Sequence, residues 1–271
     1  MPELPEVETT CRGLAPHCTG QRIVTAVVRN PKLRWPIPAN LAQLVAGQPI
    51  LGLTRRAKYL IMALPHGSII LHLGMSGSLR IMDNNSPAGV HDHIDLVLGN
   101  GTCIRLRDPR RFGAVLWTQN DVLRHPLLEN LGPEPFSELF DGHYLHSHSR
   151  GRKVPIKTFL MDNHVVVGVG NIYANEALFH AGIRPTTPAG RVSLVRYVKL
   201  AAAIRTTLER AIEAGGSTLR DFVNSSGEAG YFQQQYMVYG RTGESCRLCT
   251  HGIKHIRQGQ RSTFFCQHCQ T

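Results

Sequence analysis

The spacing of apolar residues changes along the chain, and each change marks a different kind of structure. From Leu4 to about Leu14, apolar residues recur every three or four positions, at Leu4, Val7, Cys11 and Leu14. This spacing places them on one face of a helix. Pro5 fits the first turn of such a helix, where its missing N–H has no intrahelical partner. We therefore predict that a helix opens the chain.

Between Arg22 and Thr118 the pattern changes to short β-branched and aliphatic runs, separated by turn residues such as those in Pro65-His66-Gly67 and Gly99-Asn100-Gly101. The predicted strands are Arg22–Val28, Tyr59–Ala63, Ser68–Leu73, Ile94–Leu98, Cys103–Leu106 and Ala114–Trp117. Short strands joined by tight turns are typical of an antiparallel sandwich or barrel. The first half of the chain is therefore expected to be all-β after its helix.

The second half of the chain has a helical pattern. A Pro-, Gly- and His-rich stretch around Leu131–Gly151 is interpreted as a boundary. Beyond it, Ser193 precedes a run with helical spacing that ends at Gly215-Gly216, as expected of a capped helix. The apolar positions of this run are Leu194, Val198, Ala201, Leu208 and Ile212. An α half is therefore expected to follow the β half.

Composition points to a polyanionic partner. The 271 residues include 30 Lys and Arg against 19 Asp and Glu, a formal charge of +11. Clustered cations displace counterions from a phosphate backbone, although basicity alone does not separate nucleic acid from an anionic membrane. The acidic start MPELPEVETT is unlike a signal peptide, and the apolar stretch around Leu60–Leu73 is broken by Pro65, His66 and His72. We expect an intracellular protein that does not bind membranes.

The cysteines predict a metal site in the tail. Cys246-x-x-Cys249 and Cys266-x-x-Cys269 have the spacing that places four thiolates around one zinc ion. Four cysteine ligands leave no open position, so the predicted ion is structural. The other three cysteines, at 11, 18 and 103, are scattered singly, which does not suit a disulfide scaffold.

The segments between the two cysteine pairs predict a basic β-hairpin. Ile253–Arg257 and Arg261–Phe265 can pair as strands, with Gln258-Gly259 at the turn. Arg261 follows this turn, where it can reach a phosphate or a reacting centre. An ordinary surface arginine is an equally good interpretation of the same position.

The N-terminus carries the elements of an amine nucleophile. Met1 precedes Pro2, a small residue after which the initiator methionine is normally removed. The exposed α-amino group would titrate near ~8, so a useful fraction is unprotonated at neutral pH. Attack of this secondary amine on a sugar gives an iminium cation, which is an electron sink. Glu3 and Glu6 lie one helical turn apart and can divide acid and base work, although acidic residues are also common in first turns for electrostatic reasons alone.

Six short motifs, counting the cysteine tail, resemble the formamidopyrimidine-DNA glycosylase family. They run in the order of that family and span the chain from end to end. The motifs are Pro2-Glu3-Leu4-Pro5-Glu6-Val7-Glu8, Arg55-Arg56-Ala57-Lys58-Tyr59-Leu60, His72-Leu73-Gly74-Met75-Ser76-Gly77, Asp108-Pro109-Arg110-Arg111-Phe112-Gly113 and Gly168-Val169-Gly170-Asn171-Ile172-Tyr173, with the tail cysteines Cys246, Cys249, Cys266 and Cys269.

The resemblance implies a role for each matched residue. It makes Pro2 the Schiff-base nucleophile, Glu3 the general acid, Lys58 a proton donor in β-elimination and Arg261 a participant in δ-elimination. DNA contacts are implied for His72, His91, Arg110, Lys153, Lys157 and Asn171. The basic run Arg150-Gly151-Arg152-Lys153 is less lysine-rich than is expected for the family, so Arg152 is an alternative to Lys153. Asn171 is placed as an N-cap, which also serves a helix without any ligand.

Two turns carry residues suited to opening a duplex, because a glycosylase must rotate the lesion out and fill the gap. Met75 lies in a glycine-flanked turn, and Phe112 follows two arginines in a turn opened by Asp108-Pro109. An apolar tip can wedge between bases while Arg110 binds the base left behind. Both apolar residues would otherwise be expected in the core. The pairing with Arg110 and the resemblance favour the wedge.

The resemblance implies a multidomain α and β fold. The domains are a helix plus β-sandwich over 1–134, a helix-two-turn-helix domain over 135–236 with a lesion-capping loop near Gly215–Tyr236, and a β-hairpin zinc finger over 237–271. The implied activity is a bifunctional DNA glycosylase and AP lyase that removes 8-oxoguanine and formamidopyrimidines in base excision repair. We expect a cytoplasmic, nucleoid-associated monomer with one Zn²⁺ and no catalytic metal, acting on damaged double-stranded DNA.

Two alternatives remain open from the sequence. An enzyme similar to endonuclease VIII would use the same nucleophile on oxidised pyrimidines, but Leu4, Met75 and the pair of Arg110 and Phe112 favour the purine enzyme. A non-enzymatic zinc-ribbon DNA-binding protein would explain the charge and the tail. It would not explain why Pro2, Glu3 and Lys58 occur together.

Overall fold

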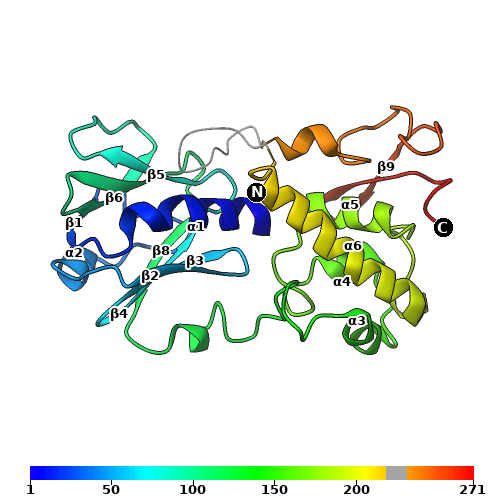
Figure 1. Cartoon of the computed structure of the whole chain (residues 1–271), viewed down its shortest axis with the longest axis horizontal. Coiled ribbons are helices and arrows are strands. Elements are labelled where there is room, and N and C mark those ends of the chain that lie inside the picture. Colours follow the sequence, from blue (N-terminus) through cyan, green and yellow to red (C-terminus); the bar gives the residue numbers. More distant parts are fainter. Residues whose placement is uncertain (218–230) are drawn as a thin grey trace. The chain divides into compact units, whose positions relative to one another are not determined.

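The computed structural model describes residues 1–217 and 231–271, which form two compact units (Figure 1). Unit 1 comprises Met1–Glu129 and Ala214–Tyr231, and unit 2 comprises Asn130–Glu213 and Phe232–Thr271. Most of the predicted lesion-capping loop, residues 218–230, lies outside the described residues. Among the residues described, no helix is both long enough and apolar enough to cross a membrane.

Unit 1 opens with helix α1, Leu4–Cys18, which confirms the predicted helix and extends it by one turn. Its apolar face is buried at Leu4, Val7 and Leu14. Glu3 is the N-cap residue, and its backbone N–H donates to Glu6 Oε2 at 2.8 Å. This bond satisfies an N–H that would otherwise be left without a partner at the helix start.

Two antiparallel sheets follow α1 and share one core with it. The first has the order β1 (Ile23–Val28), β6 (Asp92–Leu98), β7 (Thr102–Arg107) and β5 (Ser78–Asp83), and the second has the order β2 (Gly52–Arg56), β3 (Tyr59–Leu64), β4 (Gly67–His72) and β8 (Ala114–Thr118). A short helix α2, Leu41–Val45, packs on β1, and a 3-10 turn η1, Val122–Arg124, follows β8. The predicted β half is confirmed.

The apolar pattern does not predict β2 and β5. Both are edge strands of their sheets. An edge strand has a partner on one side only, and polar side chains on it discourage pairing with other chains. β2 accordingly carries Arg55 and Arg56, and β5 carries Arg80. These polar residues hide the strand signal in the sequence.

Unit 2 is helical and ends in the predicted hairpin. Its helices are α3 (Gly142–Ser149), α4 (Ile156–Leu160), α5 (Asn171–His180) and α6 (Leu194–Glu213), with 3-10 turns η2 (Ala189–Arg191) and η3 (Phe232–Gln235). Helices α3 and α5 both pack on α6. Helix α6 stops before Gly215 and Gly216, whose φ angles of 74° and 85° favour glycine.

The hairpin strands are β9, Lys254–Gln258, and β10, Arg261–Phe265, which pair antiparallel and confirm the prediction to within one residue. Strand β10 packs on α5.

The stretch around Leu131–Gly151, interpreted as a boundary, needs one correction. Part of the His-rich stretch expected to be a boundary forms helix α3, whose N-cap Asp141 accepts a 2.7 Å hydrogen bond from Tyr144 N. The cap explains why a helix forms in this polar sequence.

Candidate functional site

The predicted site residues divide between the two units. Unit 1 contains the proposed nucleophile and acid together with the two turns: Pro2, Glu3, Glu6, Lys58, His72, Met75, His91, Arg110 and Phe112. Unit 2 contains Lys153, Lys157, Asn171, Arg261 and the four tail cysteines.

The start of α1 holds a buried acidic group. Pro2 is buried, and Glu3 and Glu6 are 2% and 0% exposed. Glu6 uses both carboxylate oxygens as acceptors. Its Oε2 binds Glu3 N, and its Oε1 binds both Ser217 N and Ser217 Oγ, each at 2.8 Å. Glu6 thus holds the backbone beside Pro2 through three hydrogen bonds.

Gly216 allows this arrangement. A Cβ at this position would lie 3.2 Å from Glu6 Oε1, and the φ of Gly216 is 85°. Both the space and the backbone conformation therefore favour glycine. Ser217 is the last described residue before 218–230, so Glu6 links the N-terminus to the base of that segment.

Lys58 lies in the tight turn between β2 and β3, where Arg56 pairs with Tyr59. Ala57 has a φ of 55°, the left-handed conformation that such a turn requires. Arg55 fixes the turn by donating to Ala57 O at 3.0 Å and to Glu8 Oε2 on α1 at 2.8 Å. Burial would raise the pKa of Glu8, but the hydrogen bonds from Arg55 and Arg12 outweigh it and lower this pKa. Lys58, only 8% exposed, is thus carried on a turn tied to α1.

His72 lies at the end of β4 and is neutral at physiological pH. Burial, with Lys58 and Arg34 nearby, lowers its pKa to about 4. Its Nδ1 accepts a hydrogen bond from Gly74 N at 3.0 Å. The neutral ring therefore carries its proton on Nε2, which can donate to a phosphate oxygen.

Asp108 joins the two turns proposed to open the duplex. This carboxylate is fully buried and accepts from Ser76 Oγ and Gly113 N, both at 2.8 Å. Ser76 lies in the Met75 turn, and Gly113 follows Phe112. The sequence indicated Asp108 only as the residue that opens the Phe112 turn, and it gave no role to Ser76. The signal available was an acidic residue before proline, a frequent turn opening.

The side chains carried by these turns differ in their exposure. Phe112 is 41% exposed, and the Arg110 guanidinium lies over its ring at 5.0 Å from the centroid. The alternative that Phe112 folds into the core is therefore wrong. Met75 is half-buried. His91, also half-buried, accepts a hydrogen bond from Asp108 N through its backbone oxygen at 2.9 Å.

In unit 2 the four tail cysteines fit a zinc ion. Their Sγ atoms all lie within 4.8 Å of one another. The Sγ atoms of Cys246 and Cys269 are 3.9 Å apart, and those of Cys249 and Cys266 are 3.4 Å apart. Tetrahedral zinc with bonds of about 2.3 Å holds its sulfur ligands about 3.8 Å apart. The residues present therefore suit a closed structural site.

Lys157 supports the hairpin. It is 1% exposed, and its Nζ donates to Ser262 O at 2.8 Å and to Thr263 Oγ1 at 2.7 Å. Both acceptors lie on β10 directly after Arg261, which is exposed. A direct DNA contact by Lys157 would require these bonds to break. Lys153 and Arg152 are both exposed, so the structure does not choose between them.

Asn171 differs slightly from its predicted position. The N-cap of α5 is Gly170, with extended φ and ψ of −119° and −154°, and Asn171 is the first helical residue. The prediction of Asn171 as the N-cap is therefore wrong by one residue. Its side-chain Oδ1 is buried without a hydrogen-bond partner. Glycine has no side chain, so the N-cap residue of α5 contributes no side-chain capping bond.

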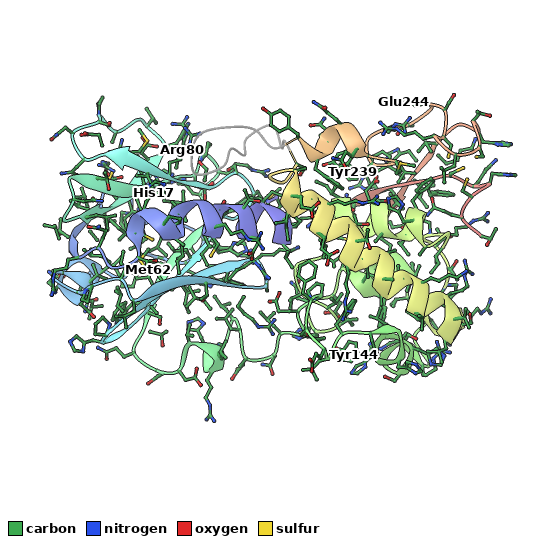
Figure 2. The ribbon with its side chains drawn as sticks, in the orientation of Figure 1. His17, Met62, Arg80, Tyr144, Tyr239 and Glu244 are labelled. Atoms are coloured by element: carbon green, nitrogen blue, oxygen red, sulfur yellow. The ribbon has the colours of Figure 1, made fainter. Side chains whose placement is uncertain are left out.

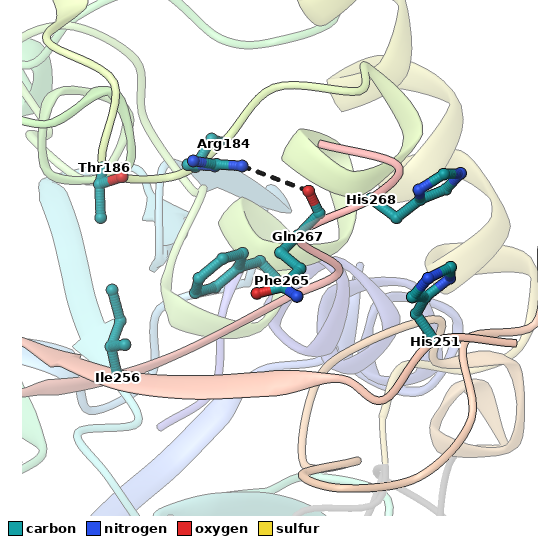
Figure 3. Close-up of a pocket in the computed structure, with 7 residues that line it drawn as sticks. All are labelled: Arg184, Thr186, His251, Ile256, Phe265, Gln267 and His268. Carbon is teal, nitrogen blue, oxygen red and sulfur yellow. Dashed lines mark hydrogen bonds between the residues drawn. The ribbon is translucent and has the colours of Figure 1, made fainter. Parts of the chain in front are cut away.

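A cavity of about 510 Å³ lies elsewhere in unit 2 (Figure 3). It is lined by Arg184, Thr186, His251, Ile256, Phe265, Gln267 and His268. None of the predicted catalytic or DNA-binding residues is among them. Arg184 closes one side by donating to Gln267 O at 3.2 Å (Figure 3). This cavity is therefore separate from the candidate site.

Comparisons with known proteins cover nearly the whole chain. Residues 1–115 match the formamidopyrimidine-DNA glycosylase N-terminal domain, 131–223 the H2TH domain of the same enzyme, and 243–271 a zinc finger found in FPG and IleRS. Formamidopyrimidine-DNA glycosylase from Marinobacter nauticus is 60% identical over 270 residues, with all of both chains covered.

Two solved structures are similar throughout. The MutM (Fpg) protein of Thermus thermophilus is 38% identical, with a TM-score of 0.89 over 99% of this chain and 98% of that one. A complex of Lactococcus lactis Fpg with DNA containing an abasic site is 33% identical, with a TM-score of 0.92 and 99% of both chains covered.

Proposed function

This chain belongs to the formamidopyrimidine-DNA glycosylase family, and we propose that it removes oxidised purines from damaged duplex DNA and then cleaves the exposed strand. It is a DNA glycosylase and AP lyase of base excision repair, with a zinc finger at its end. The substrates proposed are 8-oxoguanine and formamidopyrimidines. Support for a DNA substrate comes from the similar Lactococcus lactis Fpg, which was solved with abasic DNA.

The proposed nucleophile is the secondary amine of Pro2 after Met1 is removed. Its nitrogen forms a bond to the sugar C1′ while the bond from C1′ to the damaged base breaks and the base leaves with a proton. Glu3, buried next to it, is the proposed acid that protonates the sugar ring oxygen. The resulting iminium acidifies the neighbouring C2′–H, so the 3′ and then the 5′ phosphate leave by elimination. Lys58 and Arg261 are proposed for these steps because they match the family's motifs.

The observation that carries this proposal is the hydrogen bonding of Glu6. A buried carboxylate that holds Glu3 N and Ser217 in place fixes the backbone at Pro2 before any substrate arrives. Preorganisation of this kind lowers the cost of reaching a reactive geometry. A chain start that served only to begin a helix would not need the second set of buried hydrogen bonds, between Glu6 and Ser217.

We propose that the two turns joined by Asp108 open the duplex. Phe112 and Met75 would enter the stack, and Arg110 would bind the base left opposite the gap. His72, His91, Lys153 or Arg152, and the start of α5 at Asn171 are proposed phosphate contacts. For Lys157 the proposed role is indirect, through β10. This wedge favours the purine enzyme over one similar to endonuclease VIII.

We also propose a division into domains 1–134, 135–236 and 237–271, supported by the three matched segments. Zinc would be held by Cys246, Cys249, Cys266 and Cys269 and would supply rigidity to the hairpin rather than chemistry. A chromosomal substrate implies that the enzyme works in the cytoplasm at the nucleoid. We propose that it acts as a monomer.

Borohydride trapping tests the proposed chemistry. Reduction of the iminium links enzyme and DNA covalently, so wild type should give an adduct with an 8-oxoguanine:cytosine duplex. N-terminal sequencing should show proline first, and Pro2→Gly should lose most of the adduct. Glu3→Gln should slow base release but still trap on a preformed abasic site. A DNA-binding protein without catalysis would give no adduct, and a stronger reaction with thymine glycol would favour the pyrimidine enzyme.

A further inference from the structure

A basic pocket of about 490 Å³ lies on the sheet of unit 1 that contains β5, β6 and β7. It is lined by Arg80, Met82, Pro87, Gly89, Asp92, Arg105 and Arg107. Arg80 lies on β5 (Figure 2). None of the residues proposed for catalysis or for DNA contact lines it.

The register of the sheet brings the three arginines together. Arg80 pairs with Arg105 across β5 and β7, and Arg107 lies two residues further along β7 on the same face. Diagonal neighbours of this kind are within reach of long side chains. Arg80 and Arg107 can therefore approach one ligand from two strands.

The pocket holds more positive than negative charge. Asp95 pairs with Arg105 at 2.7 Å and with Arg29 at 2.6 Å. Asp92 lies further from its cations, 3.8 Å from Arg105 and 3.7 Å from Arg107. Three guanidinium groups and one carboxylate line the pocket, so two positive charges remain in excess. Like charges held this close repel one another unless an anion joins them.

Arg80 has unused hydrogen-bonding capacity. Its Nε is shut off from solvent and has no hydrogen-bond partner. No ion pair joins Arg80 to any carboxylate in the described part of the chain. Arg107 is 44% exposed, so the pocket is open to a ligand. A guanidinium offers a fork of donors that matches the oxygens of a phosphate.

We propose that this pocket binds a phosphate group of the DNA backbone through Arg80 and Arg107. Arg107 ends β7 and comes three residues before Arg110, and Asp92 follows His91. The pocket therefore adjoins the turns proposed to open the duplex, and this inference rests on the proposed function. Arg105, bonded to Asp95 and to the backbone oxygens of Ser86 and Pro87, forms the wall of the pocket and does not bind the ligand.

A substitution at Gly89 offers a second way to test the pocket, by placing a side chain in it. Its N–H donates to Asp92 Oδ2 at 2.8 Å, and a Cβ there would lie 3.5 Å from both Arg107 Nη1 and Asp92 Oδ2. A small side chain is therefore accommodated by ordinary contact. Gly89→Glu would carry a carboxylate toward the arginines and compete with phosphate, whereas Gly89→Gln adds the same bulk without charge.

The salt dependence of DNA binding tests the proposal. Each phosphate contact contributes about 0.9 to the slope of log K against log[NaCl]. Arg80→Gln and Arg107→Gln should each reduce this slope by about 0.9, and Gly89→Glu should reduce it more than Gly89→Gln. Arg124→Gln is the matched control, because it removes the same charge from a side chain that is 87% exposed and lies outside the pocket. Equal slopes for all variants would overturn the proposal.

Inorganic phosphate separates the two sources of the ligand. At constant ionic strength, phosphate should raise the Tm of wild type and of Arg124→Gln more than that of Arg80→Gln or Arg107→Gln. If it does so while the DNA slopes stay equal, the pocket takes free phosphate and the assignment to the DNA backbone is wrong. Borohydride trapping on an abasic duplex should succeed with every variant at low salt. Its failure in wild type would instead overturn the proposed function.

Discussion

Ser76 Oγ donates a hydrogen bond of 2.8 Å to Asp108 Oδ1, although the two residues are 32 positions apart. The bond joins the turn that carries Met75 to the turn that carries Arg110 and Phe112. Asp108 is fully buried, and its second oxygen accepts from Gly113 N. Both turns are thus fixed before a ligand binds, so the wedge proposed for the duplex is preorganised.

Removing the hydroxyl should therefore impair duplex opening more than chemistry. Ser76→Ala leaves the Asp108 carboxylate without one donor, at a cost of roughly 1–3 kcal/mol in unfolding free energy. Excision of 8-oxoguanine from a duplex should fall several-fold, while cleavage at an abasic site in single-stranded DNA, which needs no wedge, should change little. Single-turnover rates on the two substrates, with the exposed Ser147→Ala as control, measure this. An equal loss on both substrates would contradict the role assigned to the turns.

The hydrogen bond between Ser76 and Asp108 also separates the features that the sequence predicts from those that it does not. Helix α1, helix α6, the cysteine tail and eight of the ten described strands follow from local periodicity and spacing, because each is specified by residues near one another in the chain. Asp108 with Ser76 and Glu6 with Ser217 depend on long-range contacts. A single sequence gives no measure of distance between such positions, so these tethers could not be predicted from it.

The burial of Lys157 could not be predicted for the same reason. A lysine in a basic protein is usually solvated, and the resemblance suggested a DNA contact. Its acceptors lie 105 and 106 positions away, on a strand whose docking on α5 is a tertiary event. By contrast, the zinc site was predictable because the four ligands come in two local pairs whose spacing alone defines the chemistry.

His72 should make the protein less stable as the pH falls. Its pKa is lowered to about 4 in the folded chain from an ordinary value of 6.5, so below pH 6.5 the unfolded chain binds a proton that the folded chain does not. Stability is unaffected by this group above pH 6.5 and falls as the pH drops from 6.5 toward 4. The loss between pH 7 and pH 5 should be on the order of 2 kcal/mol.

Urea unfolding of wild type and His72→Asn at both pH values checks this. Asparagine offers an oxygen to Gly74 N in place of Nδ1 but does not titrate in this range. The variant should lose less stability than wild type on acidification, by about the amount assigned to His72. Parallel losses in the two proteins would show that His72 is protonated in the folded state.

Zinc should be needed for the hairpin to stay ordered. The buried apolar cluster around the tail is small, comprising Phe179, Val238, Cys246, Ile253 and Cys266. Such a cluster supplies little stability, whereas structural zinc commonly contributes about 10 kcal/mol or more of binding free energy. We expect one zinc per chain, loss of amide protection in β9 and β10 on chelation, and restoration by Zn²⁺ but not by Mg²⁺. Unchanged protection after the metal is removed would contradict this role.

Lys157 should act on DNA only through the hairpin. Lys157→Met keeps the length of the side chain but leaves Ser262 O and Thr263 Oγ1 without their buried donor, which should destabilise β10 by roughly 1–3 kcal/mol and lower strand cleavage by misplacing Arg261. The slope of log K against log[NaCl] should stay at the wild-type value, since no phosphate contact is lost. Lys153→Met and Arg152→Gln are the variants for comparison, because both side chains are exposed. Whichever of them contacts phosphate should reduce the slope by about 0.9. A similar reduction for Lys157→Met, with hydrogen exchange in β10 unchanged, would instead establish a direct DNA contact.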